Sequence, residues 1–212
     1  RNNAGTILAI YRGGYYLRIW YNILIFGIMI YELVLFFSAV VIFAVYNITM
    51  IALYDVPTSL SETFYLLQDE RKGLGYIFTV MMWAVAFLLL PAWLGVSDRL
   101  GGWECYCTPI AFAAAAAICF AGSAPAFRNL GMESKVHSIA AKSAAFFALA
   151  WCVIACWRIM YVPILACVIT LVYGYGTNTF NRCATYWLEL AAFTATFCTL
   201  AVECIVWQTL LI

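Results

Sequence analysis

One stretch decides the fold class. Residues 20–51 read WYNILIFGIMIYELVLFFSAVVIFAVYNITMI, and Glu32 is the single charged residue among them. A helix needs about 20 consecutive apolar residues to cross a bilayer, whereas a membrane β-barrel shows segments of about ten residues with alternating hydrophobicity. The stretch therefore predicts a membrane-spanning helix that is long enough to tilt strongly or to emerge from the bilayer.

The rest of the chain is equally apolar. Of the 212 residues, 67% are hydrophobic and 10% are charged, and the mean hydropathy is +0.95. Soluble domains are about half apolar and a quarter charged, so this composition excludes a soluble domain. The net charge of +1 lacks the basic field that nucleic-acid binding needs, and we expect no nucleic-acid partner.

Five further apolar runs predict an all-α, polytopic transmembrane bundle of six spans in a single domain, residues 1–212. The break near Arg158 is the weakest, and one kinked helix there would reduce the count to five. The prolines, Pro91 included, are expected in connections or terminal turns. The first residue is Arg1, so the native start stays open. The predicted spans cover about residues 20–51, 75–94, 105–122, 136–157, 160–173 and 186–211.

The loop charges distinguish the two membrane faces. The positive-inside rule does not choose an orientation, although three arginines before Trp20 favour an amino terminus inside. Which membrane the chain occupies is also left open. The connections after the first, third and fifth predicted spans, residues 52–74, 123–135 and 174–185, share one face and hold most of the loop charges. We expect any functional site on this odd-connection face.

The connection after the first span contains a helix-start pattern. Ser59 is followed three residues later by Glu62, the arrangement of a helix cap with a reciprocal acidic residue. The same hydroxyls and carboxylate could also bind a headgroup or a solute at the membrane surface. The predicted ligand-binding residues on this face are Ser59, Ser61, Glu62, Arg128, Glu133, His137 and Lys142.

His137 is the only histidine, and Glu133 lies one turn before it. A histidine beside a carboxylate can act as a pH switch or a general base, whereas a lone histidine at a helix start is more often a hydrogen-bonded boundary residue. A single histidine excludes a multi-histidine metal site, and the pair Cys105 and Cys107 lacks a second pair at zinc spacing. We expect no metal and no cofactor, and we assign no catalytic residue.

Three carboxylates fall inside predicted spans, and such residues are costly unless they are paired, protonated or facing water. Glu189 and Glu203 share one face of the last span, about 21 Å apart. Together with Glu32 they predict an intramembrane polar path. The alternative is that Glu189 and Glu203 lie at the membrane–water interface and reach a headgroup. Lys142 is the expected charged partner of Glu32.

The layout resembles a known family. Pro57, Ser59 and Ser61 just after the first of six helices, Gly75 leading the second and His137 at the mouth of the fourth are similar to the six-span DRAM and Frag-like membrane proteins and their bacterial relatives. That family usually shows an Ile-Ser-Asp-x-Gly run where residues 60–63 read LSET. The resemblance implies a non-enzymatic protein linked to lipid or membrane homeostasis.

Small residues recur on the fourth span, where Ala140, Ala144 and Ala148 form one stripe. Such stripes let helices approach closely in lipid, so this one predicts a packing seam in the monomer core or at a subunit interface. The leading functional hypothesis is a non-enzymatic protein that binds a lipid or small amphiphile. The alternatives are an oligomeric pore or small transporter that uses the carboxylates, and a membrane hydrolase or transferase with His137 as base. The expected partners are the bilayer, the bound lipid or amphiphile, and either a second copy or another membrane protein.

Overall fold

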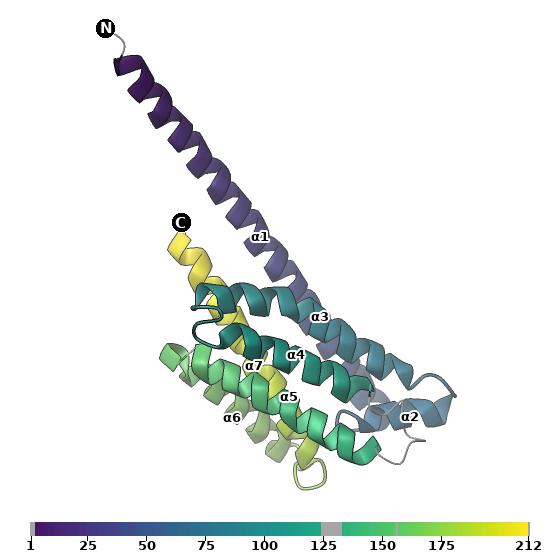
Figure 1. Ribbon diagram of the computed structural model, residues 1–212. Coiled ribbons are helices and arrows are strands. Elements are labelled where there is room, and N and C mark those ends of the chain that lie inside the picture. Colours follow the sequence, from purple (N-terminus) through teal and green to yellow (C-terminus); the bar gives the residue numbers. More distant parts are fainter. Residues whose placement is uncertain (1–2, 124–132, 156, 212) are drawn as a thin grey trace.

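The computed structural model describes residues 3–123, 133–155 and 157–211, with side chains at 27–123, 136–154 and 157–206. The regular secondary structure in this part of the chain is all helical, with no strand, which confirms the all-α prediction for the described residues. The helices are α1 (Asn3–Tyr54), α2 (Glu62–Glu70), α3 (Tyr76–Arg99), α4 (Cys107–Ser123), α5 (Glu133–Ala155), the 3₁₀ turn η2 (Trp157–Ile159), α6 (Tyr161–Gly176) and α7 (Ala184–Leu211) (Figure 1).

Four helices are long and apolar enough to cross a membrane, by length and composition. They contain the segments Gly27–Tyr54, Tyr76–Arg99, Val136–Ile154 and Ala184–Val206. Helices α4 and α6 coincide with the other two predicted spans but have only 17 and 16 residues. Helices α5 and α6 are separate, with η2 between them. The chain is thus supported as a helical membrane protein with at least four candidate spans.

Helix α1 begins much earlier than predicted. It has 52 residues and starts at Asn3, whereas the sequence predicted a start near Trp20. The segment before Trp20 contains no proline, so helical hydrogen bonds continue through Gly13 and Gly14 despite their low propensity. At 1.5 Å per residue the helix is about 78 Å long, more than twice a 30 Å hydrocarbon layer. Its amino-terminal part projects away from the other helices (Figure 1).

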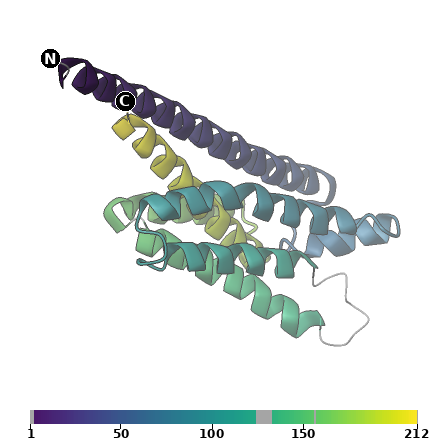
Figure 2. The ribbon, with the colours of Figure 1, turned by 45° about the horizontal axis from the view of Figure 1, so that its top comes forward.

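Helix α3 lies between α1 and α4 (Figure 2). Its Trp93 is fully buried and packs edge-to-face on Trp151 of α5, with ring centroids 5.8 Å apart. Pro91 lies inside this helix, so the prediction that it occupies a terminal turn is wrong. The helix continues to Arg99 because a membrane helix can tolerate an interior proline where neighbouring helices surround it.

The alanine stripe is a packing seam within one chain. Ala140, Ala144 and Ala148 are all buried on α5, which packs against α4 and α7. Their small side chains let the backbones approach closely, and this confirms the seam in the monomer core rather than between subunits.

Candidate functional site

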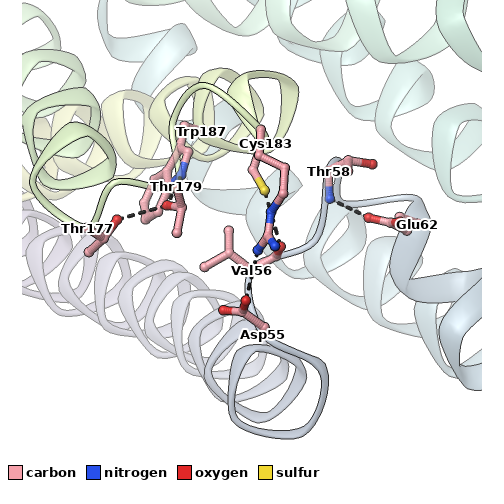
Figure 3. A network of polar contacts seen from close by, with 9 residues as sticks. Asp55, Val56, Thr58, Glu62, Thr177, Thr179, Cys183 and Trp187 are labelled. Atoms are coloured by element: carbon pink, nitrogen blue, oxygen red, sulfur yellow. Dashed lines mark hydrogen bonds and ion pairs between the residues drawn. The ribbon is translucent and has the colours of Figure 1, made fainter.

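The segment that follows α1, residues 55–61, lies along the first turns of α7 (Figure 3). We call it the strap. Every second strap residue contacts every third residue of the segment formed by Cys183 and the first turns of α7, so the contacts lie along one side of it. One of these bonds satisfies an amide in the first turn of α7 that has no partner within the helix. The three contacts are Cys183 Sγ to Val56 O (3.2 Å), Tyr186 N to Thr58 O (3.1 Å) and Leu60 N to Glu189 Oε2 (2.8 Å).

An exposed ion pair closes the outer end of the strap. Arg182 donates from Nη2 to Asp55 Oδ2 at 2.8 Å, and both side chains are mostly exposed. This bond, with help from the Val56 amide, holds the pKa of Asp55 below its ordinary value, and Asp55 in turn raises the pKa of Arg182. Exposed pairs contribute little to stability, so the pair orients the strap more than it holds the fold.

The inner end of the strap leads into α2, whose N-cap is Ser61 without a side-chain cap bond, so the prediction of Ser59 as the cap is wrong. Ser59 Oγ accepts the Glu62 N–H at 3.2 Å, and the Glu62 carboxylate accepts the N–H of Thr58. The reciprocal bond therefore falls one residue earlier than in a capping box, and the helix itself begins at Glu62. Ser61 bonds Ser59 through their hydroxyls at 3.0 Å.

A buried polar network lies beneath the strap, and it was not predicted from the sequence. The one local signal for it is an asparagine, Asn47, inside an apolar run. Tyr46 of α1 donates to Thr63 Oγ1 at 2.6 Å. Tyr186 of α7 donates to Asn47 Oδ1 at 3.1 Å, and Asn47 donates to Phe43 O. These bonds link α1 to α2 and α1 to α7, and so fix the helices that the strap connects and packs against.

A cavity of about 40 Å³ opens inside the bundle directly below the strap. Four helices, α3, α4, α5 and α7, surround it, and Leu60 and Ser61 of the strap contribute to its lining. Since a buried water needs about 10–15 Å³, there is room for about three. Its polar lining residues are Ser61, His137, Glu189 and Thr196, and its small ones are Ala121, Ala141, Ala144, Ala145, Ala148 and Ala192.

The cavity is polar at one end only. Ser61 follows α1, His137 lies in the second turn of α5 and Glu189 in the second turn of α7, so all three belong to the odd-connection face. Along α5 the lining runs from His137 to Ala148, a rise of about 16 Å. The deeper lining is apolar apart from Thr196 and the indole of Trp93.

His137 lines the cavity at its polar end and makes a hydrogen bond to α4. Its Nδ1 lies 3.1 Å from the carbonyl oxygen of Ala121, in the last turn of α4. A carbonyl only accepts, so Nδ1 donates and satisfies an oxygen near the end of that helix. The hydrogen bond predicted for a histidine at a helix start is present.

The structure thus brings together part of the predicted binding set. Ser61 and His137 share the cavity with Glu189, which the sequence had placed in the polar path instead. Ser59 and Glu62 are engaged in starting α2. Lys142 is exposed on α5. Arg128 lies outside the described residues, as does the side chain of Glu133.

Glu32 is paired at the opposite end of the bundle. Arg99 Nη2 lies 2.9 Å from Glu32 Oε2, and the Glu32 side chain is only 9% exposed. The prediction of Lys142 as its partner is wrong, because α1 packs mainly on α3 and not on α5. The carboxylate rests on Gly95, where an added Cβ would lie 2.1 Å from Glu32 Oε1. Gly95 and Arg99 are four residues apart and so share one helix face, where the glycine leaves space beside the arginine for a carboxylate. This spacing could have identified Arg99 as the partner of Glu32.

Glu203 lies toward the same end of the bundle. It is 8% exposed and belongs to the last third of α7, far along the helix from Glu189. Between Glu189 and Glu203, the hydroxyls of Thr196 and Thr199 donate to carbonyls of their own helix. Two of the three acids therefore gather at one end, and the third lines the cavity at the other.

Among the described residues, no group of three or more His, Cys, Asp or Glu side chains could hold a metal ion. In comparisons with family models, with curated proteins and with solved structures, nothing matches this chain.

Proposed function

We propose that this chain is a non-enzymatic integral membrane protein that binds a lipid or a small amphiphile at its odd-connection face. The observation that carries the proposal is the cavity, whose lining is polar at the membrane face and apolar below. Ser61, His137 and Glu189 would meet the head of the ligand. The alanines of α5 and Phe193 of α7 would meet its tail.

The proposed topology places all six longer helices across the membrane, with the amino terminus inside. Helices α4 and α6 measure about 25 and 24 Å, slightly less than a 30 Å hydrocarbon layer. A bilayer accommodates a short helix by local thinning at a modest cost. In this topology the strap, the end of α4 and the start of α7 all lie at one interface, where an amphiphile already places its head.

The size of the cavity favours a slim, single-chain ligand. The cavity of about 40 Å³ is too small to hold a full acyl tail, so α5 and α7 would have to separate for the tail to enter. The facing side chains there are small, Ala144 and Ala148 on one helix and Ala192 on the other. Because apolar stabilisation scales with buried area, such a seam opens at lower cost than one built from leucines.

The head would carry a hydrogen-bond donor. A carboxylate offers about four acceptor positions, and the Leu60 amide occupies one of those on Glu189. An ammonium or hydroxyl head can bind beside it without displacing the strap. This bond pattern supports a neutral or cationic head over an anionic one.

The geometry supports the two alternatives less well. A hydrolase would need Ser61 activated by His137, but the Ser61 hydroxyl bonds Ser59 and His137 Nδ1 bonds Ala121 O. A pore would need Glu32 to line a path, and Arg99 already neutralises it.

Photolabelling with a 16-carbon primary amine that carries a diazirine at mid-chain tests the proposal. We expect labels in α5 and α7 at lining residues, and Ala145→Leu, which fills the cavity from a half-buried position, should reduce them at least fivefold. The matched control is Ala116→Leu on the exposed face of α4, which should leave them unchanged. If the lining residues are labelled equally in Ala145→Leu and in Ala116→Leu, the proposal is refuted.

A further inference from the structure

The deep end of the cavity contains a donor without an acceptor. Trp93 is fully buried and lines the cavity, and its Nε1–H has no hydrogen-bond partner in the described structure. The other buried indoles that the structure describes are satisfied. Trp151 donates to Ser97 Oγ at 2.8 Å, and Trp187 donates to Thr179 Oγ1 at 3.0 Å.

Such a donor is unusual. Buried polar groups are nearly always paired, because an N–H removed from water without a new acceptor destabilises the folded state. Ser97 shows that the region can supply acceptors, since its hydroxyl accepts from Trp151 while donating to Trp93 O at 2.7 Å. The indole of Trp93 instead adjoins empty space.

We propose that an oxygen atom of the bound amphiphile accepts this N–H. The inference rests on the proposed function and narrows the ligand to a class: a single-chain amphiphile with a second, uncharged oxygen, such as a hydroxyl or a carbonyl, far down its tail. A plain hydrocarbon tail would leave Trp93 unpaired.

The lining sets the position of that oxygen. From Glu189 to Thr196 the cavity wall on α7 rises about 10 Å, and from Phe78 to Trp93 the wall on α3 rises about 22 Å. The second oxygen therefore lies roughly 10–22 Å below the head. Thr196 is the polar lining residue of α7 at this depth, and its hydroxyl donates to Ala192 O.

Two probes that differ by one oxygen test the inference. The binding of 1-dodecanol and of 1,12-dodecanediol is measured in nanodiscs for the wild type, Trp93→Phe and Trp151→Phe. The ratio of the two affinities is compared between proteins, so that the different partitioning of the probes into lipid cancels. We expect Trp93→Phe to lower the preference for the diol about fivefold, the effect of one net hydrogen bond. Trp151→Phe, the packing control, should leave the ratio unchanged.

The outcomes separate this inference from the proposed function. An unchanged ratio in Trp93→Phe, with dodecanol binding still sensitive to Ala145→Leu, overturns the inference and leaves the proposed function standing. An affinity for 1-dodecanol that is the same in the wild type and in Ala145→Leu counts against the proposed function itself.

A measurement on the wild type covers the case in which Trp93→Phe does not fold. In protein labelled with ¹⁵N-tryptophan, the diol should move one indole N–H proton resonance downfield, and dodecanol should not. That resonance should persist in Trp151→Phe. Equal responses to both probes would overturn the inference.

Discussion

Glu189 and Glu32 are both carboxylates inside apolar helices, but the protein stabilises them in different ways. Glu32 faces an arginine at 2.9 Å and packs on Gly95, where an added Cβ would clash with its carboxylate. Glu189 accepts a single backbone N–H, from Leu60, and borders a cavity. The first is a closed ion pair that joins α1 to α3. The second retains accepting capacity and adjoins space for a ligand, so burial of an acid alone does not mark a binding site.

The largest effect should come from breaking the closed pair. Arg99→Leu leaves Glu32 without its partner, and an uncompensated buried charge costs about 3 kcal/mol or more of unfolding free energy. The measurement is unfolding in mixed detergent micelles. Adding Glu32→Leu should recover most of the loss, since a buried pair replaced by apolar residues is often neutral. A double variant as unstable as Arg99→Leu would show that the pair has no such role.

At the other acid, Glu189→Leu removes the acceptor of the Leu60 amide. We expect the strap to open more easily by about 1–3 kcal/mol, the cost of an unpaired buried amide, as measured by hydrogen exchange of residues 56–61. Glu189→Gln keeps a carbonyl oxygen and should lose less. If both variants exchange at wild-type rates, Glu189 does not hold the strap.

A smaller effect is expected from Gly95→Ala. The new Cβ would push the Glu32 carboxylate aside, and the flexible side chain can move, so the cost should be about 1–2 kcal/mol in the same unfolding measurement. Gly27→Ala is the control, because nothing lies within 4 Å of a Cβ there. That control should be neutral or slightly stabilising. Equal effects at both positions would argue against close packing of Glu32 on α3.

The smallest effect concerns the exposed pair of the strap. Because Arg182 lowers the pKa of Asp55 in the folded state, the pair stabilises the protein above the ordinary carboxyl pKa of about 3.9. The stabilisation is lost as the pH falls through the lower folded pKa. Asp55→Asn should therefore lower Tm slightly at pH 7, and the difference from wild type should begin to shrink below about pH 4 and vanish only below the lowered folded pKa.

Asp69→Asn is the control for this pH series, since Asp69 is exposed and no ion pair is described for it. Its Tm difference from wild type should stay near zero at every pH. A Tm difference for Asp55→Asn that stays constant as the pH falls from about 5 to about 2 would contradict the assignment.

Several elements could be read from local sequence. The apolar runs predicted the ends of five helices within five residues, and the Ser59–Glu62 pattern predicted a helix cap two residues before the N-cap of α2, Ser61. The start of α1 was missed, because nothing in local composition distinguishes a helix that leaves the bilayer from one that ends at its surface. Ser61 and His137 line one cavity, but Trp93 and Thr196 were not considered, since an indole or a hydroxyl in an apolar run resembles ordinary core.

The sequence by itself determined that this is a helical membrane protein with long apolar helices, because hydropathy and helical periodicity depend only on neighbours along the chain. Only the tertiary structure decided which acid meets which partner. Glu32 meets Arg99, 67 residues away, and Glu189 meets Leu60, 129 residues away. Such pairs follow from which helix faces pack together, and many packings satisfy the same apolar pattern. The same packing leaves the donor of Trp93 beside empty space.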